Sequence, residues 1–271
     1  MSSKERIGVF SKLEADWFIH VFPDKTIARI AKKASITNRI GTSHRTYHWL
    51  TCNKSINFSR RKSDLHEAQL NCILLKPLEI NIPPIEKFWQ YYGFENPEET
   101  KKIFGQLLDS KRKNIVLHPK SKGTAREWGL ENFERLIRLL PEDQFKIFIT
   151  GTQDEAELMK EFLERNKDKV TNITGTFTLN EFVIFLSMTD GMVACSTGPL
   201  HIAAALGKTT VGIYPPIRPM HPGRWAPLGK QVHVLVKDTE CNDCRKSLNC
   251  HCMREISPET VKKVLVERCK R

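Results

Sequence analysis

The chain has 271 residues, of which 40% are hydrophobic, and it carries a formal net charge of +12 at pH 7. This length is enough for one large or two modest domains with their own cores. The sequence has no apolar run long enough to predict a membrane-spanning helix. The first residues, MSSKERIGVF, also lack the apolar segment of a secretory signal, which favours a cytoplasmic protein.

The excess of positive charge predicts an acidic partner, which is nucleic acid, an anionic membrane surface or a phosphorylated substrate. The basic residues are spread along the chain, and the densest cluster is RRK at 60–62. They come without a homeodomain, zinc-finger or RNA-recognition signature. We therefore expect a phosphorylated ligand and no nucleic acid.

The N-terminal part predicts an irregular series of elements. We expect a strand over 15–23, a short basic helix over 26–34, a strand running into a loop over 38–44, and a helix over 63–78. The helix over 63–78 begins with a pattern like a capping box at Ser63. A linker ending in a helix follows over 83–108, so we place a domain boundary between 80 and 112. Residues 1–100 then form a first domain with its linker, and 101–271 a second.

The second domain predicts a regular alternation of strands and helices. Strands are expected over 114–119, 145–151, 170–175, 191–195 and 209–215, and helices over 130–140, 154–167, 178–190 and 199–207. Such alternation predicts a doubly wound α/β domain, whose parallel sheet is covered on both faces. Ligands of these sheets bind at the carboxyl ends of the strands.

The loop after the strand over 114–119 carries hydroxyl and cationic side chains, at Lys120, Ser121, Lys122, Thr124 and Arg126. Short donors and positive charge together suit a diphosphate, although a solvated basic loop is the alternative interpretation. GxxxxGK[ST] and GxGxxG are both missing from the sequence, which argues against a Walker A loop and a dinucleotide fingerprint. Glu155, after the next strand, suits either ribose hydroxyls or a helix N-terminus.

The stretch STGPLH (196–201) opens the helix that follows the strand over 191–195. Ser196 or Thr197 suits the N-cap, and Pro199 suits the first helical position, so capping alone explains these residues. Capping requires neither Gly198 nor His201. Gly198 lets backbone N–H groups approach an anion, and His201 in the first turn can donate to a phosphate oxygen. A helix cap and a phosphate site therefore both remain open.

Four of the eight cysteines are crowded into CNDCRKSLNCHC, at Cys241, Cys244, Cys250 and Cys252. A CxxC pair followed by CxC is one candidate for a structural zinc site. The alternative is a reduced, cysteine-rich surface loop without metal.

Three segments of the chain resemble glycosyltransferase family 9, the ADP-heptose:lipopolysaccharide heptosyltransferases, in order and spacing. They are HPKSKGTAREWGLENFERLIRLL (118–140), TGTQDE (150–155) and STGPLHIAAALGKTTVGIYPP (196–216). SDLHEAQLN (63–71) resembles the family's acceptor-side helix. The resemblance implies a GT-B fold, in which two Rossmann-like domains face a cleft. Here the N-terminal domain is expected to be incomplete, because the family's first βαβ unit has no match.

The resemblance also implies a reaction and a set of site residues. A heptose or related sugar would pass with inversion from an ADP-sugar to a phosphorylated lipopolysaccharide core at the inner membrane face, with no cofactor required. The protein would be cytoplasmic and peripheral to that membrane. The donor diphosphate and sugar would lie against Ser121, Lys122, Thr124, Arg126, Ser196, Thr197, Gly198 and His201, and the nucleoside against Glu155 and Phe177.

Two departures from the family pattern bear on this expectation. Many members carry Asp where this chain has Ser196, which bears on the identity of the donor sugar. The family's N-terminal catalytic Asp has no match, and Asp24 is the substitute that the sequence offers. Two alternatives follow: a catalytically incomplete fragment or nucleotide-sugar-binding protein of this fold, and a nucleotide-sugar epimerase or hydrolase of the same architecture.

Overall fold

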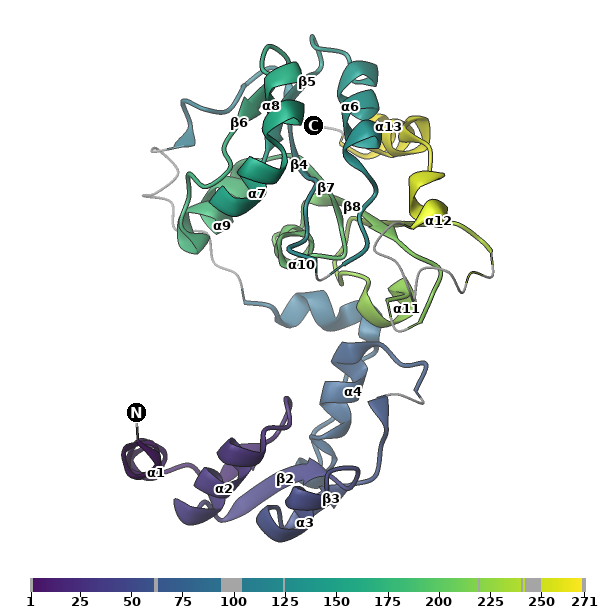
Figure 1. Ribbon diagram of the computed structural model, residues 1–271. Helices are drawn as coiled ribbons and strands as arrows, with labels where there is room; N and C mark the ends of the chain where they lie inside the picture. Colours follow the sequence, from purple (N-terminus) through teal and green to yellow (C-terminus); the bar gives the residue numbers. More distant parts are fainter. Residues whose placement is uncertain are drawn as a thin grey trace. The chain divides into compact units, whose positions relative to one another are not determined.

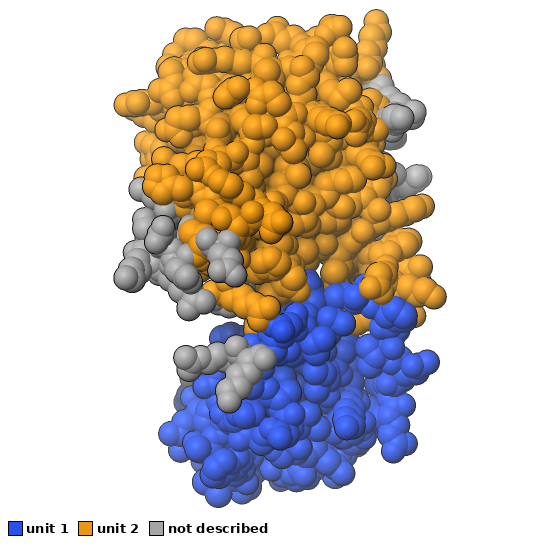
Figure 2. All heavy atoms as spheres, turned by 90° about the vertical axis from the view of Figure 1, so that its right-hand side faces the viewer, with its two compact units in different colours: residues 1–85 blue, residues 86–271 orange. Residues whose placement is uncertain are grey.

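The computed structural model describes residues 2–60, 63–93, 104–123, 125–218, 220–239, 241 and 250–269. The chain divides into two compact units, residues 1–85 and 86–271, which Figure 2 colours separately. The sequence-based boundary lies at residues 100 and 101. Each unit contains a parallel β-sheet, so the predicted α/β class is confirmed.

Unit 1 (residues 1–85) is built on a three-stranded parallel sheet of order β1-β2-β3 (Figure 1). The strands are β1 (Trp17–Ile19), β2 (Asn38–Thr42) and β3 (Lys54–Ile56), and the helices are α1 (Ser3–Lys12), α2 (Lys25–Lys33), α3 (Thr46–Thr51) and α4 (Glu67–Ile73). Helix α2 buries Ala28, Ile30 and Ala31. The sequence pattern does not predict α1, α3 or β3. The strand that it predicts over 15–23 is longer than the observed β1.

The helix predicted over 63–78 is wrong at both ends. Helix α4 begins after His66, whose ring accepts from the Ala68 amide while the Gln69 side chain accepts from the His66 amide. The capping box therefore belongs to His66 and not to Ser63. A separate 3₁₀ turn (η2, Lys76–Leu78) follows, and a second 3₁₀ segment (η3, Ile85–Tyr91) lies at the start of the predicted linker. The helix expected at the end of that linker falls mainly on 94–103, outside the described residues.

Unit 2 (residues 86–271) contains a six-stranded sheet of order β6-β5-β4-β7-β8-β9, in which every neighbouring pair is parallel. The strands are β4 (Lys113–His118), β5 (Phe145–Ile149), β6 (Val170–Asn172), β7 (Gly191–Cys195), β8 (Thr209–Tyr214) and β9 (Val232–Val236). Counted from β4, the order is 3-2-1-4-5-6, which is that of a Rossmann sheet. Strand β9 was not expected.

Helices cover both faces of this sheet. They are α6 (Leu130–Leu139), α7 (Gln153–Leu158), α8 (Lys160–Arg165), α9 (Leu179–Met188), α10 (Gly198–Ala205), α11 (Pro222–Trp225), α12 (His251–Arg254) and α13 (Pro258–Arg268). Helices α6 and α13 lie side by side (Figure 1). Alternate residues of β4 point to opposite faces: Ile115 joins the core under α6 and α13, and Val116 joins the core under α9 and α10.

The helix predicted over 154–167 is in fact two helices, α7 and α8, which meet at Met159. Met159 has φ −110° and ψ 10°, and only 1% of it is exposed, because its side chain enters the core. The predicted N-cap of α9 at Thr178 is confirmed, since the Thr178 side chain accepts from the Glu181 amide. Among the described residues, no helix is long and apolar enough to span a membrane.

Candidate functional site

The candidate site lies at the carboxyl edge of the unit 2 sheet, where the strand order reverses. Strands β4 and β7 are parallel neighbours, and His118 at the end of β4 pairs with Ala194. The loops that follow these two strands therefore start side by side. In open α/β sheets, ligands bind in the crevice at this reversal point.

Glu127 organises the loop after β4. Its carboxylate accepts from the Ser121 amide at 3.1 Å and the Ser121 hydroxyl at 3.0 Å, and it pairs with the Lys120 ammonium at 2.5 Å. Ser121 is consequently buried, with its hydroxyl directed at Glu127 and the Ala125 carbonyl. Glu127 is not among the residues that the sequence pattern singles out, because any acid in a basic loop looks like ordinary charge balance.

The remaining cations of this loop differ in exposure. Lys122 is exposed and has φ 48°, in the left-handed region that favours glycine, while Arg126 is buried at 9% exposure. Thr124, predicted to contact the diphosphate, lies outside the described residues. In this loop Lys122 is therefore accessible to a ligand from solvent, whereas the Arg126 side chain is buried.

Glu155 is buried at the first turn of α7, with 3% of its surface exposed. One carboxylate oxygen accepts from the Thr152 amide at 2.8 Å, and the other accepts from the Lys122 amide at 3.0 Å. Glu155 therefore caps α7 and also fixes the loop after β4. The ribose contact expected for it stays a prediction.

Helix α10 begins at the second loop of the site, with Thr197 in the N-cap position and Gly198 as its first residue. Thr197 makes no side-chain cap hydrogen bond, and its buried hydroxyl has no hydrogen-bond partner within the part of the chain that the structure describes. Pro199 is the second helical residue and not the first. The prediction that Ser196 or Thr197 occupies the N-cap position is therefore confirmed for Thr197, but its hydroxyl does not form a cap hydrogen bond.

Gly198 is exposed, and a Cβ placed on it would meet no atom within 4 Å. The N-terminus of α10 is thus open on the side of Gly198. The Ser196 side chain interacts with that of Tyr214, and the Tyr214 hydroxyl donates to the Trp225 carbonyl at 2.8 Å. His201 lies half-buried in the first turn. Residues 196–201 therefore form the open helix end that a phosphate site requires.

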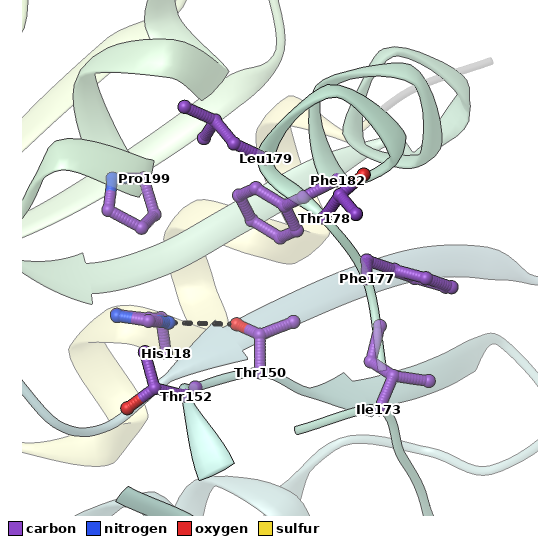
Figure 3. Close-up of a pocket in the computed structure, with 10 residues that line it drawn as sticks. His118, Thr150, Thr152, Ile173, Phe177, Thr178, Leu179, Phe182 and Pro199 are labelled. Carbon is purple, nitrogen blue, oxygen red and sulfur yellow. Dashed lines mark hydrogen bonds between the residues drawn. The ribbon is translucent and has the colours of Figure 1, made fainter. Parts of the chain in front are cut away.

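A pocket of about 230 Å³ opens at the carboxyl ends of β4, β5 and β6, beside the first turns of α9 and α10 (Figure 3). Its apolar side includes Phe177, which packs edge-on against Phe104 at 5.1 Å, and its lining extends to Pro199 of α10. Its lining residues are His118, Thr150, Gly151, Thr152, Ile173, Phe177, Thr178, Leu179, Phe182 and Pro199. An apolar wall beside a few polar groups suits a planar ring such as a nucleobase.

His118 brings a titratable group to this pocket and is not among the residues predicted from the sequence. Its Nδ1 lies 2.9 Å from the Thr150 hydroxyl (Figure 3). Burial lowers the pKa of His118 below its usual value, although the negative charges of Glu155 and Glu127 act to raise it. The ring is therefore neutral at pH 7. The signal in the sequence is a histidine at the last position of a buried strand.

The other predicted site residues lie elsewhere. Asp24 caps α2, where its carboxylate accepts from the Ile27 amide at 2.8 Å. Of the four clustered cysteines, Cys244 lies outside the described residues, Cys250 and Cys252 are buried in the core, and Cys241 is hydrogen-bonded to Cys252. Burial raises the pKa of the Cys252 thiol to about 11. A zinc ion at this cluster stays a prediction.

A Rossmann-type strand order with an open helix end at its reversal point defines the class of unit 2 as a doubly wound α/β domain. Residues 25–252 match the model of glycosyltransferase family 9 (heptosyltransferase), so the chain belongs to this family.

The chain is also similar to a curated relative and to two solved structures. A Haemophilus influenzae protein with a provisional glycosyltransferase name is 29% identical over 221 residues, which cover 79% of this chain and 64% of the relative. The chain thus spans less than two thirds of this relative's length. Escherichia coli ADP-heptose LPS heptosyltransferase II superposes with a TM-score of 0.75 at 18% identity, covering 98% of this chain and 81% of that one. E. coli heptosyltransferase WaaC with ADP gives a TM-score of 0.65 at 18% identity, with coverage of 98% and 78%. These two structures show a shared fold.

Proposed function

We propose that the protein transfers a heptose or a related sugar from an ADP-linked donor to a lipopolysaccharide core acceptor, with inversion at the transferred sugar. The observation that carries the proposal is the N-terminus of α10, which lies at the reversal of strand order and has no side-chain cap. The family match and the named donor of one E. coli relative, ADP-heptose, support the choice of donor. The proposed reaction needs no cofactor beyond that donor.

The donor diphosphate is the part of the substrate that these loops suit best. A helix N-terminus carries partial positive charge and free N–H groups, which attract an anion. Gly198 leaves room for close approach, and the exposed Lys122 supplies a full positive charge in the loop after the neighbouring strand β4. Arg126, Thr124 and His201 complete the set that we propose for the diphosphate, with Ser121, Ser196 and Thr197 shaping the two loops.

The chemistry follows from where charge develops. An acceptor hydroxyl attacks the anomeric carbon as the bond from that carbon to the diphosphate oxygen breaks, so ADP leaves with the bonding electrons. Donors already aimed at the diphosphate stabilise that charge without reorganising, which lowers the barrier. The acceptor proton must pass to a base. We do not assign this base to Asp24, because its carboxylate caps α2.

The nucleoside is proposed to occupy the pocket beside His118. Phe177 would lie against the adenine, and a neutral His118 would present a hydrogen-bonding group without adding charge. Glu155 would act there mainly as a positioning residue, because both of its carboxylate oxygens already accept from Lys122 and Thr152.

The acceptor is proposed to be a phosphorylated lipopolysaccharide core at the inner face of the inner membrane, with the protein cytoplasmic and peripheral to that membrane. The net charge of +12 supports an anionic acceptor surface, because Lys and Arg in excess attract such a surface at moderate ionic strength.

Calorimetric titration with ADP and with ADP-heptose tests the donor site. We expect saturable binding that is weakened by His201→Ala and Arg126→Ala, and unchanged by Arg138→Ala, whose guanidinium lies exposed on α6. Saturable binding that both site variants leave intact would refute the site. Product analysis with lipopolysaccharide core then separates the alternatives: ADP binding without transfer indicates a nucleotide-sugar-binding protein, and sugar release without acceptor indicates a hydrolase.

A further inference from the structure

Two histidines and a cysteine of unit 1 lie close together in space, although they come from different segments of the chain. His20 directly follows β1, His48 lies in α3, and Cys52 follows α3. One potential ligand atom from each lies within 4.8 Å of the others. His20 and His48 are almost fully buried, at 2% and 1% exposure, and Cys52 is half-buried.

Two backbone hydrogen bonds hold the segments that carry these side chains. The His20 amide donates to the Ile40 carbonyl at 3.0 Å, which holds His20 against β2. The Cys52 amide donates to the His48 carbonyl at 2.8 Å, so the two residues share one helical turn. Residues four apart project from the same face of a helix, which is the spacing of paired metal ligands in helical motifs.

Gly41 of β2 makes room for this arrangement. A Cβ on Gly41 would lie 2.6 Å from His48 Nδ1 and 2.7 Å from Cys52 Sγ. Both contacts are too close for any real side chain, so the absence of a Cβ lets His48 and Cys52 pack directly over the strand. Gly41 is therefore required for the packing of His48 and Cys52 and not for a turn of the backbone.

The orientation of the imidazoles leaves nitrogen lone pairs for a ligand. His48 Nδ1 lies 3.1 Å from the Thr42 carbonyl, and an oxygen acceptor there requires Nδ1 to carry the proton. The lone pair then sits on His48 Nε2. Among the residues that the structure describes, neither His48 Nε2 nor His20 Nε2 has a hydrogen-bond partner, although both atoms are buried. Metal-binding histidines are commonly oriented by such a bond from their other nitrogen to a carbonyl.

We propose that His20, His48 and Cys52 bind a divalent transition metal ion of the zinc class, with a fourth position left for water. Imidazole nitrogen and thiolate sulfur are the ligands that zinc prefers. Bonds of about 2.0–2.3 Å in tetrahedral geometry separate ligand atoms by roughly 3.3–3.8 Å. Binding would therefore bring ligand atoms that are now up to 4.8 Å apart closer together by about 1–1.5 Å. The ion would join β1 to α3 across β2 and stabilise a small unit with three short strands.

Metal binding is best measured in the whole 271-residue chain carrying Cys241→Ser and Cys244→Ser, which disrupts the C-terminal cysteine cluster as a second metal-binding site. Co²⁺ is the probe, because a cobalt–thiolate bond gives charge-transfer absorption and a tetrahedral ion gives strong visible bands. We expect one equivalent of Co²⁺ that Zn²⁺ displaces, and a melting temperature that rises with added Zn²⁺.

Matched variants separate a metal site from a buried cluster without metal. Cys52→Ser should abolish the charge-transfer band, and His20→Gln should lower Zn²⁺ affinity by more than the ~10–100-fold that loss of an outer-shell partner costs. Cys72→Ser and His44→Gln, in the same unit, should leave both readouts unchanged. The proposal is overturned if the folded chain without any substitution takes up no Co²⁺. It is also overturned if adding Cys52→Ser to the Cys241→Ser, Cys244→Ser protein leaves the Co²⁺ spectrum unchanged.

Discussion

The backbone amide of Lys122 donates to the carboxylate of Glu155 at 3.0 Å, across 33 residues of sequence. This bond joins the loop after β4 to the first turn of α7, and it holds Lys122 in a left-handed conformation. The geometry of the proposed diphosphate site therefore depends on a residue whose own carboxylate is buried.

Glu155→Gln tests this relationship. Glutamine offers one oxygen in place of two, so either the Lys122 or the Thr152 amide loses its acceptor, and each such bond to a charged group contributes about 1.5–3 kcal/mol. We expect lower thermal stability and at least ~10-fold weaker ADP binding by calorimetry. Glu5→Gln is the control, because Glu5 forms the same kind of capping box at α1 in unit 1. Equal loss of ADP affinity in both variants would contradict the role of Glu155.

Gly198→Ala separates ligand binding from folding. The added methyl meets no protein atom, and alanine favours helix more than glycine, so stability should hold or rise. The same methyl would obstruct the approach of a phosphate to the first turn of α10. We expect at least ~10-fold weaker ADP binding, measured by calorimetry, with an unchanged or higher melting temperature.

Gly8→Ala in α1 is the matched control, because its methyl also enters open space. This variant should keep full ADP affinity. If Gly198→Ala binds ADP as tightly as the parent protein, the open end of α10 does not hold the diphosphate.

His118 predicts a pH dependence of stability. Burial lowers its folded-state pKa, so the unfolded chain takes up the proton first, near the ordinary value of about 6.5. The contribution of neutral His118 is complete above that pH and is lost as the pH falls toward the folded pKa. For one proton the free energy of unfolding falls by at most about 1.4 kcal/mol per pH unit.

Urea unfolding at pH 7.5, 6.0 and 5.0 measures this effect as the difference between the parent protein and His118→Gln. The glutamine variant should show the shallower decline below about pH 6.5. Glu155 and Glu127, whose charges oppose the shift, are present in both proteins. Identical pH profiles would show that His118 titrates as it does in the unfolded chain.

Leu265→Ala tests whether the C-terminal helix belongs to the core of unit 2. Leu265 of α13 is fully buried in the cluster that includes Phe133 of α6, and removing such a side chain costs about 2–5 kcal/mol. Val266, the next residue, is 46% exposed, so Val266→Ala should change stability by about 0.5 kcal/mol or less. Denaturant midpoints of the two variants give the comparison, and similar midpoints would place α13 outside the core.

The candidate site could be predicted from sequence only in outline. The two loops, at 120–126 and 196–201, stand out because hydroxyl, cationic and glycine residues follow apolar strands. His118 and Glu127 do not stand out, because their significance rests on contacts. His118 and Thr150 are 32 residues apart in the sequence, and only the register of β4 beside β5 brings their side chains together. The His20, His48 and Cys52 cluster is likewise invisible until three segments fold together.

The sequence by itself determined the alternation of buried strands and amphipathic helices in unit 2, because the periods of strands and helices are local properties of the chain. That alternation restricts the sheet to a parallel one covered on both faces. Only the tertiary structure decided the strand order, the break between α7 and α8 at Met159, and the contacts that bury the Ser121 hydroxyl against Glu127. These features depend on hydrogen bonds and burial between residues distant in sequence, which no local pattern encodes.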